Sequence, residues 1–380
     1  MSFRTALLSL SSTLCLGVAG IAGIVALCSL SGCVTRTTLD PDGVSVIRIY
    51  QFSSTVADPQ PAWNPANYQV VVRSLGGFGL MQEGQGRQEY FESRENRPTF
   101  YPVWLNRDQF VFGPQRNVTS VSDGRVVAAT DGLTIVAVVD NGLKSSVERA
   151  AFAATGYRPR VGGMAVYAQV EDKMIVVNRD GRTSDAGEGF YPEPQSIGQG
   201  ICWQETPIFE IDRWTGKPPR GRLFIRWSPG QVTEIPGGCE ARWTPQGGVV
   251  CTVLRGDPGL TEWWSGGTDV MFIENAASAP RLIAKDARSP APHPREPLAA
   301  VADAANGVRL VSLREPQANE RLLAATGSGP RWSFDGLRLM TVESRSSGAA
   351  ATGSSNTGAN ANDVPAMMMI YVLKVSPGTL

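Results

Sequence analysis

The sequence has little charge and almost no histidine. Aspartate, glutamate, lysine and arginine together make up 18% of its 380 residues, and 35 acidic residues balance 35 basic ones. Long helices need charged faces and nucleic-acid-binding proteins carry a basic excess, so the composition favours neither. The 41 glycines and 26 prolines instead indicate many short strands joined by turns. We therefore predict an all-β protein that binds no nucleic acid.

Motifs for catalysis and for metal or cofactor binding are also missing. The single histidine, His293, lies between Pro292 and Pro294, a setting typical of an exposed loop. The sequence contains no C-x-x-C pair, no G-x-S-x-G nucleophile motif and no G-x-G-x-x-G nucleotide-binding motif. We therefore expect no catalytic residue, no metal site and no cofactor, and a non-catalytic role for the chain.

The N-terminal residues have the pattern of a secretion signal. Arg4 supplies a positive charge, and the apolar run that follows ends in Leu30-Ser31-Gly32-Cys33. This ending resembles the lipobox of bacterial lipoprotein signal peptides, which implies cleavage before Cys33 and lipidation of that residue. Cys15 and Cys28 each follow a leucine, a residue too large for the position before such a cleavage site.

The resemblance implies a chain outside the cytoplasm, held to a membrane by acyl chains that each gain about 0.8 kcal/mol per buried methylene. Val34 stands where an inner-membrane retention signal has aspartate, which favours the outer membrane in a cell that has one. A retained signal-anchor helix is the alternative, because the uncharged run is long enough to span a bilayer. We expect residues 1–32 to be the signal peptide, 33–43 a lipidated linker and 44–380 a single domain.

Three further cysteines lie in the expected mature chain. An exported protein can form disulfides, and Cys239 and Cys251 flank a predicted turn at residues 245–248. These two are therefore the expected disulfide pair. The alternative is that both of them and Cys202 are small buried apolar side chains.

A weak repeat runs along the mature chain. Its clearest copy, residues 329–342, has a short strand, the turn sequence Trp332-Ser333-Phe334-Asp335-Gly336 and an alternating apolar strand. Weaker copies occupy residues 239–253 and 101–112, and each copy continues into further strands. Four strands in about 40 to 50 residues are typical of a propeller blade. The openings resemble the WD40-like repeat of TolB-type β-propellers.

This resemblance implies a β-propeller of four-stranded antiparallel blades. We count seven blades from residue 44 onward, whereas TolB-type propellers have six, and the strand predicted at 45–52 could instead close the ring beside the last blade. Ring closure leaves no exposed sheet edge. The proline-rich residues 290–297 are predicted to be a connector between blades, and residues 344–363, which are poor in large apolar side chains, a disordered loop. Four tryptophans that we place at one repeat position are predicted to pack within the blades: Trp104, Trp203, Trp243 and Trp332.

Three insertions are predicted between the second and third strands of their blades, where loops emerge on one face. They contain Trp214, the pair Trp263 and Trp264, and residues 344–363. Exposed tryptophans are favoured at partner sites and as sugar platforms, although these could equally pack over their blades. The leading hypothesis is an envelope lipoprotein whose loop face binds a protein partner. The alternative is a propeller that binds or cleaves polysaccharide, and a third reading is a structural spacer.

Overall fold

Contacts in a computed structural model divide the chain into residues 1–34 and 35–380. The structure describes the following residues of the second unit: 37–40, 44–54, 61–74, 77–82, 87–92, 103–122, 125–139, 142–150, 160–162, 165–170, 173–177, 183–205, 221–255, 267–303, 307–315, 320–324, 327–345 and 366–375. Cys33 and the expected signal peptide lie outside them. No helix within these ranges is long and apolar enough to cross a membrane.

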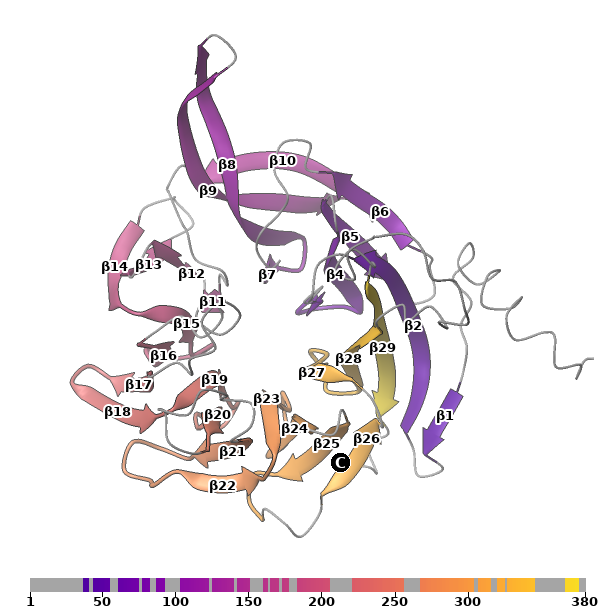
Figure 1. The fold of residues 1–380 in the computed structure, drawn as a ribbon, viewed down its shortest axis with the longest axis vertical. Helices are drawn as coiled ribbons and strands as arrows, with labels where there is room; N and C mark the ends of the chain where they lie inside the picture. Colours follow the sequence, from indigo (N-terminus) through magenta and orange to yellow (C-terminus); the bar gives the residue numbers. More distant parts are fainter. Residues whose placement is uncertain are drawn as a thin grey trace, which may run out of the picture. The chain divides into compact units, whose positions relative to one another are not determined.

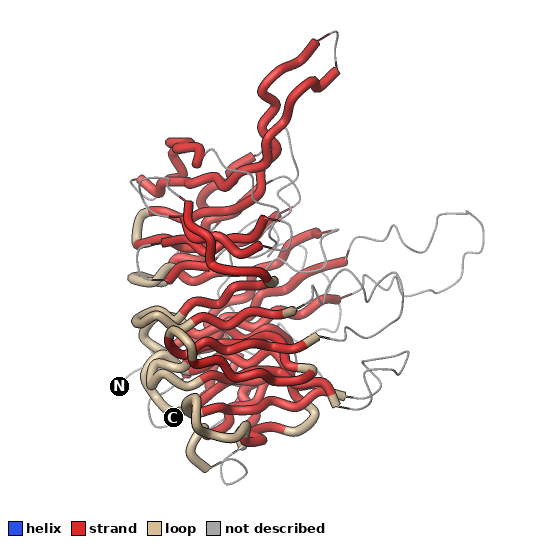
Figure 2. Tube along the Cα trace, turned by 90° about the vertical axis from the view of Figure 1, so that its left-hand side faces the viewer, coloured by secondary structure: helices blue, strands red, loops and turns tan. Residues whose placement is uncertain are grey.

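The described part of the chain is built of β-strands that pair antiparallel in seven sheets (Figures 1 and 2). In sequence order the first three sheets are as follows. One holds β3 (Ala62–Trp63), β4 (Gln69–Ser74), β5 (Gly77–Gln82) and β6 (Arg87–Glu92). The next holds β7 (Val103–Asn106), β8 (Gln109–Ser122), β9 (Arg125–Val139) and β10 (Gly142–Ala150). The third holds β11 (Arg160–Gly162), β12 (Ala165–Val170), β13 (Lys173–Val177) and β14 (Thr183–Glu188).

The next three sheets have the same strand order. One holds β15 (Phe190–Pro194), β16 (Ile201–Gln204), β17 (Arg222–Ser228) and β18 (Gln231–Pro236). The next holds β19 (Gly238–Trp243), β20 (Val249–Leu254), β21 (Thr268–Ile273) and β22 (Arg281–Ala284). The third holds β23 (Ala287–Pro292), β24 (Leu298–Asp303), β25 (Val308–Ser312) and β26 (Arg321–Ala324).

The last sheet joins the two ends of the described chain. It holds β27 (Ser328–Trp332), β28 (Arg338–Arg345), β29 (Ala366–Val375), β2 (Val44–Ser54) and β1 (Thr37–Asp40), in that spatial order. β2 pairs with β29 from Val44 opposite Val375 to Ser54 opposite Ala366. The alternative in which the N-terminal strand closes the ring beside the last blade is therefore confirmed. Each first strand, from β3 through β27, contacts the first strand of the next sheet, and β27 contacts β3.

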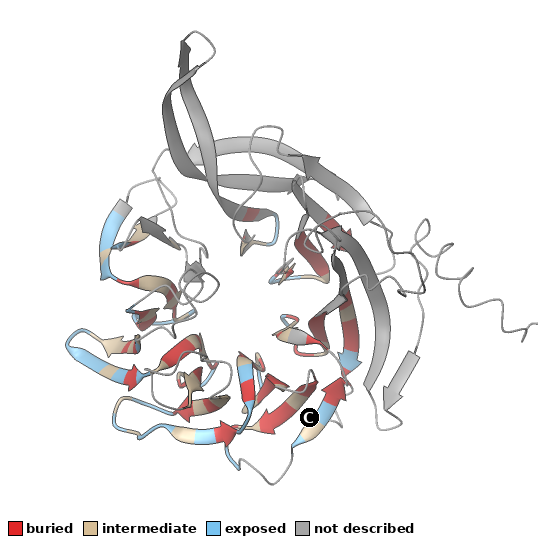
Figure 3. Ribbon diagram, in the orientation of Figure 1, coloured by how far each residue is buried: buried red, intermediate tan, exposed pale blue. Residues whose placement is uncertain are grey.

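The hydrophobic core lies between neighbouring sheets, because alternate strand residues face opposite sides of a sheet. One cluster joins Cys202 and Ile225 to Val249 and Cys251 of the next sheet, and another joins Val70 and other residues of β4 and β5 to those of β28 and β29. Exposed positions fall mainly on turns and outermost strands such as β18 (Figure 3). The sheets of β19–β22, β23–β26 and β27–β29 each take part in two such clusters and are packed on both faces, which is why strands such as β20 are apolar at successive positions.

A bulge recurs in the first strand of four consecutive sheets. In each strand the pairing register shifts at the same place, and the residue there has a positive φ: Tyr191 (54°), Glu240 (50°), Ser289 (52°) and Gly329 (56°). Non-glycine residues rarely adopt this conformation. Bulges of this kind turn a side chain in a new direction, so these strands present their residues differently from regular strands.

Four tryptophans tie the first strands of neighbouring sheets together. Trp63, Trp243 and Trp332 occupy the last paired position before the turn, which we call the indole position, and Trp104 holds it one pair earlier, before an irregular pair at Asn106. Each donates its indole N–H to a backbone carbonyl oxygen of the preceding sheet in the ring: Trp63 to Arg331 (3.0 Å), Trp104 to Ala62 (3.0 Å), Trp243 to Glu193 (2.9 Å) and Trp332 to Ala291 (3.1 Å).

One of the four tryptophans expected at this repeat position, Trp203, does not occupy it. Trp203 lies on the second strand β16, where it stacks on Phe224 with ring centroids 5.3 Å apart. Trp63, which lies before an Asn-Pro turn that departs from the repeat sequence, holds the indole position instead.

The expected disulfide between Cys239 and Cys251 is not formed, and both residues are buried thiols, as is Cys202. Cys239 lies opposite Thr252 in the ladder, so the adjacent Cys251 faces the other side of the sheet. There Cys251 joins the same core cluster as Cys202 of the preceding sheet. The prediction was wrong because it considered only that the two cysteines lie close together along the hairpin. It did not consider that successive residues of a strand face opposite sides of the sheet.

Candidate functional site

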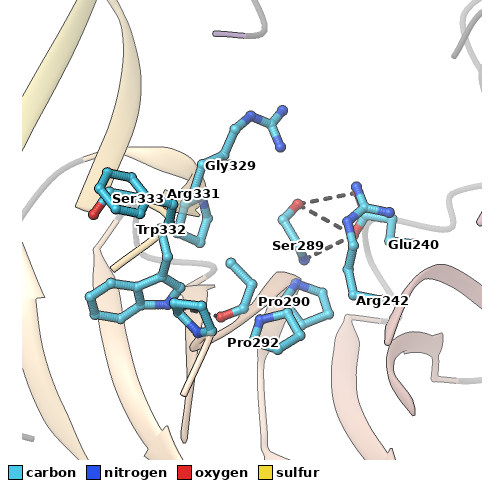
Figure 4. Close-up of a pocket in the computed structure, with 13 residues that line it drawn as sticks. Glu240, Arg242, Ser289, Pro290, Pro292, Gly329, Arg331, Trp332 and Ser333 are labelled. Carbon is cyan, nitrogen blue, oxygen red and sulfur yellow. Dashed lines mark hydrogen bonds between the residues drawn. The ribbon is translucent and has the colours of Figure 1, made fainter. Parts of the chain in front are cut away.

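A cavity of about 380 Å³ opens between the first strands of three consecutive sheets (Figure 4). This volume is in the range of sites that bind small molecules or single side-chain groups. Its lining comes from β19, β23 and β27 and the turns after the last two: Glu240, Arg242, Ser289, Pro290, Ala291, Pro292, Pro294, Gly329, Pro330, Arg331, Trp332, Ser333 and Phe334.

The cavity lies beside a sheet that lacks a tryptophan at the indole position. Pro292 pairs with Ala299 at the place where Trp243 pairs with Val249 and Trp332 with Leu339. A pyrrolidine ring is much smaller than an indole and donates no hydrogen bond. Pro292 lines the cavity, and Pro194 holds the same position in β15, where it pairs with Ile201.

The prolines here were expected to form a connector, and this was wrong for the first part of residues 290–297. Pro290 and Pro292 lie within β23, and only from His293 onward does the chain form the turn. β23 is an edge strand that pairs with β24 alone. An edge strand has N–H groups that need no ladder partner, so it tolerates proline.

One wall of the cavity is polar and is held together by Glu240. Its carboxylate accepts hydrogen bonds from the Ser289 backbone N–H (2.8 Å), the Ser289 hydroxyl (3.1 Å) and the Thr252 hydroxyl (2.8 Å). Both Glu240 and Ser289 are at positive φ, so the bulges of adjacent sheets face each other across this network (Figure 4). The network fixes the relative position of β19 and β23 at the cavity.

Arg242 lies on the same wall and is only partly exposed. Its Nη1 group donates to the Glu193 carboxylate at 3.3 Å and to the Ala241 carbonyl oxygen at 2.8 Å. The side chains of Arg242 and Glu193 are 23% and 18% exposed, so the ion pair is shielded from solvent more than a surface pair is. Figure 4 shows Arg242 and Arg331 on opposite sides of Ser289.

The other wall is apolar. Trp332 lies there, held by its bond to the Ala291 carbonyl oxygen, and Pro290 and Pro330, which also line the cavity, are buried. Phe334, at the tip of the next turn, is 37% exposed. The site thus joins an aromatic and proline surface to a charged, hydrogen-bonding surface.

His293 lies beside this apolar wall and is buried, contrary to the exposed loop expected from its proline neighbours. Its Nδ1 accepts hydrogen bonds from the backbone N–H groups of Arg295 (3.2 Å) and Glu296 (2.9 Å), which leaves Nε2 to donate to the Gly336 carbonyl oxygen at 3.1 Å. Its ring meets Trp332 edge to face. Burial lowers the pKa of His293, so it is a neutral bridge between two turns.

The turn that carries Phe334 is the predicted Asp-Gly turn. Asp335 accepts hydrogen bonds from the Ser333 hydroxyl (2.7 Å) and the Leu337 backbone N–H (3.0 Å). Gly336 has φ of 76°, and a Cβ there would overlap the ring of His293. Tyr68 of the neighbouring sheet donates its hydroxyl to the other oxygen of Asp335. The turn is thereby fixed from both sides.

The residues proposed as sites from the sequence are not among those that form the cavity. Trp214, Trp263 and Trp264, like Cys33, lie outside the described residues. The sheet order does place the loops that carry them between second and third strands, namely β16 and β17, and β20 and β21. The sequence does contain a signal for the cavity, because Pro292 replaces tryptophan at a repeat position. That signal can be recognised only when the repeats are aligned correctly.

Comparison with solved structures identifies the fold. The WD40 domain of Neurospora crassa Pan2 matches with a TM-score of 0.54 and 11% identity, over 89% of this chain and 97% of that one. The fold is a β-propeller. The predicted fold class, an all-β propeller of antiparallel blades, is therefore confirmed. A structure of YCF48 bound to D1 peptide matches with a TM-score of 0.48 and 9% identity, over 89% of this chain and 99% of that one. No protein-family model and no curated protein sequence matches the chain.

Proposed function

We propose that this propeller is a non-catalytic binding protein whose inner cavity receives a segment of a partner protein. The observation that carries the proposal is the cavity beside Pro292, which has an apolar and a polar wall. Preformed pockets with few, well-placed polar groups are typical binding sites.

The ionisable groups near the cavity support binding rather than chemistry. His293 uses both ring nitrogens in hydrogen bonds to the backbone. Glu240 accepts bonds on both carboxylate oxygens. A general base needs a lone pair directed at the substrate proton. The His293 ring offers none, because both of its nitrogens are used, and the Glu240 carboxylate is held in the wall by Ser289 and Thr252. We therefore propose that these residues position a ligand.

The proposal also includes the lipid anchor expected from the sequence. Acylation of Cys33 would hold the propeller at a membrane outside the cytoplasm, with the outer membrane favoured. The mass of the N-terminal peptide from native membranes tests this part by itself. An acylated peptide that begins at Cys33 is the expected result, and an unmodified peptide from near Met1 would replace the lipid anchor with a signal-anchor helix.

The loops that carry Trp214, Trp263 and Trp264 are proposed to extend the partner surface. We expect alanine substitutions there to weaken partner binding. If these substitutions instead abolish binding to a glycan array, the polysaccharide alternative replaces the protein partner.

Cross-linked capture from the native envelope tests the cavity itself. Pro292→Trp is expected to fill the cavity, and four other first strands accept tryptophan at this position. Val232→Trp, on the exposed outer strand β18, adds the same group away from the cavity and is the control. Partner proteins captured by the native chain and the control should be lost with Pro292→Trp. Equal capture by all three would contradict the proposal.

A further inference from the structure

We propose that the segment received by the cavity carries an acidic side chain next to a large apolar one. This inference rests on the proposed function and specifies the chemistry of its partner. It follows from three features: the arginines of the lining, the hydrogen-bond donors of Arg242, and the apolar wall at Trp332.

The charged residues of the lining include two arginines, Arg242 and Arg331, and one glutamate, Glu240. The Glu240 carboxylate accepts bonds from Ser289 and Thr252, and Glu193 pairs with Arg242 from outside the lining. A ligand carboxylate would therefore be recognised by the directed donors of an arginine and not by an excess of positive charge.

Arg242 has hydrogen-bond donors that could reach such a carboxylate. Its bonds to Glu193 and Ala241 both use Nη1. The guanidinium carries five N–H donors in a planar fork, and Nε and Nη2 of Arg242 make no hydrogen bond to the described residues. Because the side chain is held by Glu193 and is only 23% exposed, the fork is already ordered, which lowers the entropy lost when a carboxylate binds.

The apolar wall sets the neighbouring residue of the ligand. Trp332 and the buried prolines Pro290 and Pro330 offer no side-chain donor to the cavity beyond the indole N–H, which is used in the bond to Ala291. A leucine or an aromatic side chain would be stabilised there by the removal of its apolar surface from water. A peptide is favoured over a neutral saccharide, because a saccharide has no carboxylate to accept the donors of Arg242.

Peptide display on the immobilised full chain in detergent tests the inference. The probe is a random phage-displayed library of linear peptides, selected on the native chain and on Arg242→Gln with Glu193→Gln, which removes both members of the ion pair. Arg288→Gln is the matched control, because Arg288 is exposed on β23 and does not line the cavity. Pro292→Trp reports dependence on the cavity.

We expect the native chain and Arg288→Gln to enrich peptides with aspartate or glutamate beside leucine or an aromatic residue. The paired Gln variant should bind those peptides about tenfold more weakly or worse, since a charge-assisted hydrogen bond is lost, while a preference for the apolar residue persists. Enrichment that depends on the cavity but shows no acidic preference would overturn this inference and leave the proposed function intact. No enrichment sensitive to Pro292→Trp, or binding to a glycan array instead, would overturn both.

Discussion

Trp63 donates its indole N–H to the backbone carbonyl oxygen of Arg331, 3.0 Å away in space and 268 positions away in the chain. The same bond joins three other pairs of neighbouring blades, but this one connects β3 to β27 and so crosses the junction where the ring closes. Tyr68 and Asp335 add a second bond across the same junction. Two recurring features of the repeat, the indole position and the turn, therefore both contribute bonds to the junction between β27 and β3.

Replacement of Trp63 by phenylalanine should weaken ring closure. It keeps an aromatic ring and removes the N–H, so the free energy of unfolding should fall by about 1 kcal/mol. Equilibrium unfolding followed by circular dichroism measures the change. Trp203→Phe is the control, because Trp203 stacks on Phe224 and donates its indole to none of the described residues. A loss with Trp203→Phe as large as that with Trp63→Phe would show that ring size, and not the bond, decides the effect.

Replacement of Tyr68 by phenylalanine should act on the ionisation of Asp335. Burial raises the pKa of Asp335, but bonds from Tyr68, Ser333 and Leu337 outweigh it and hold the pKa below its ordinary value. A carboxyl whose pKa is lowered by folding adds stability above its unfolded pKa, and this stability is lost as the pH falls through the folded pKa. Tyr68→Phe should therefore reduce stability at pH 7 by about 1 to 3 kcal/mol and reduce the loss of stability on acidification below pH 4.

Acid titration of unfolding, read by tryptophan fluorescence, checks this expectation. Tyr167→Phe makes the same chemical change on β12, at a hydroxyl that bonds to none of the described residues, and should leave the acid profile unchanged. A profile for Tyr68→Phe that overlays the native one would show that Tyr68 does not stabilise the Asp335 carboxylate.

The only histidine of the chain should make the free energy of unfolding depend on pH near pH 6. Burial lowers the pKa of His293 below its ordinary value of 6.5. Above pH 6.5 both states are neutral; as the pH falls further the unfolded chain takes up a proton that the folded chain refuses, so stability decreases toward the folded pKa. His293→Asn should remove this decrease between pH 7 and pH 5.

Asparagine is the matched replacement for His293, because Asn64 occupies the corresponding turn position of another blade. Its side-chain oxygen accepts a hydrogen bond from the backbone N–H of Ala66 (2.9 Å), as Nδ1 of His293 does from Arg295. Chemical denaturation at a series of pH values measures the slope. An identical slope in both proteins would mean that His293 is protonated in the folded state.

The thiols of the core should resist alkylation in the native protein. Burial raises the pKa of Cys251 to about 12 and raises that of Cys202 as well, and only the thiolate reacts readily. After iodoacetamide treatment at pH 8, mass spectrometry should find both residues unmodified in the folded chain and modified in denaturant. Rapid labelling of the folded chain would show that the core between these two blades opens.

The sequence allowed the fold class to be predicted because the repeat is local. The strand, the Asp335-Gly336 turn and the next strand are encoded within a few residues, and their recurrence indicates a propeller. The cavity could not be predicted in the same way, since its lining comes from residues of three blades. His293 was misplaced for the same reason: its proline neighbours indicate a loop, whereas its partner, the Gly336 carbonyl, comes from the next blade.

The pairing of β2 with β29 has a consequence for the order of synthesis. β2 leaves the ribosome among the first segments of the described chain and its partner β29 among the last, so the final sheet cannot form on a nascent chain. Contacts this distant in sequence make folding slow, and until they form β2 retains an unpaired edge that can pair with other chains. Termination before Ala366 would make that state permanent, and such a truncated chain should aggregate even though the other blades are intact.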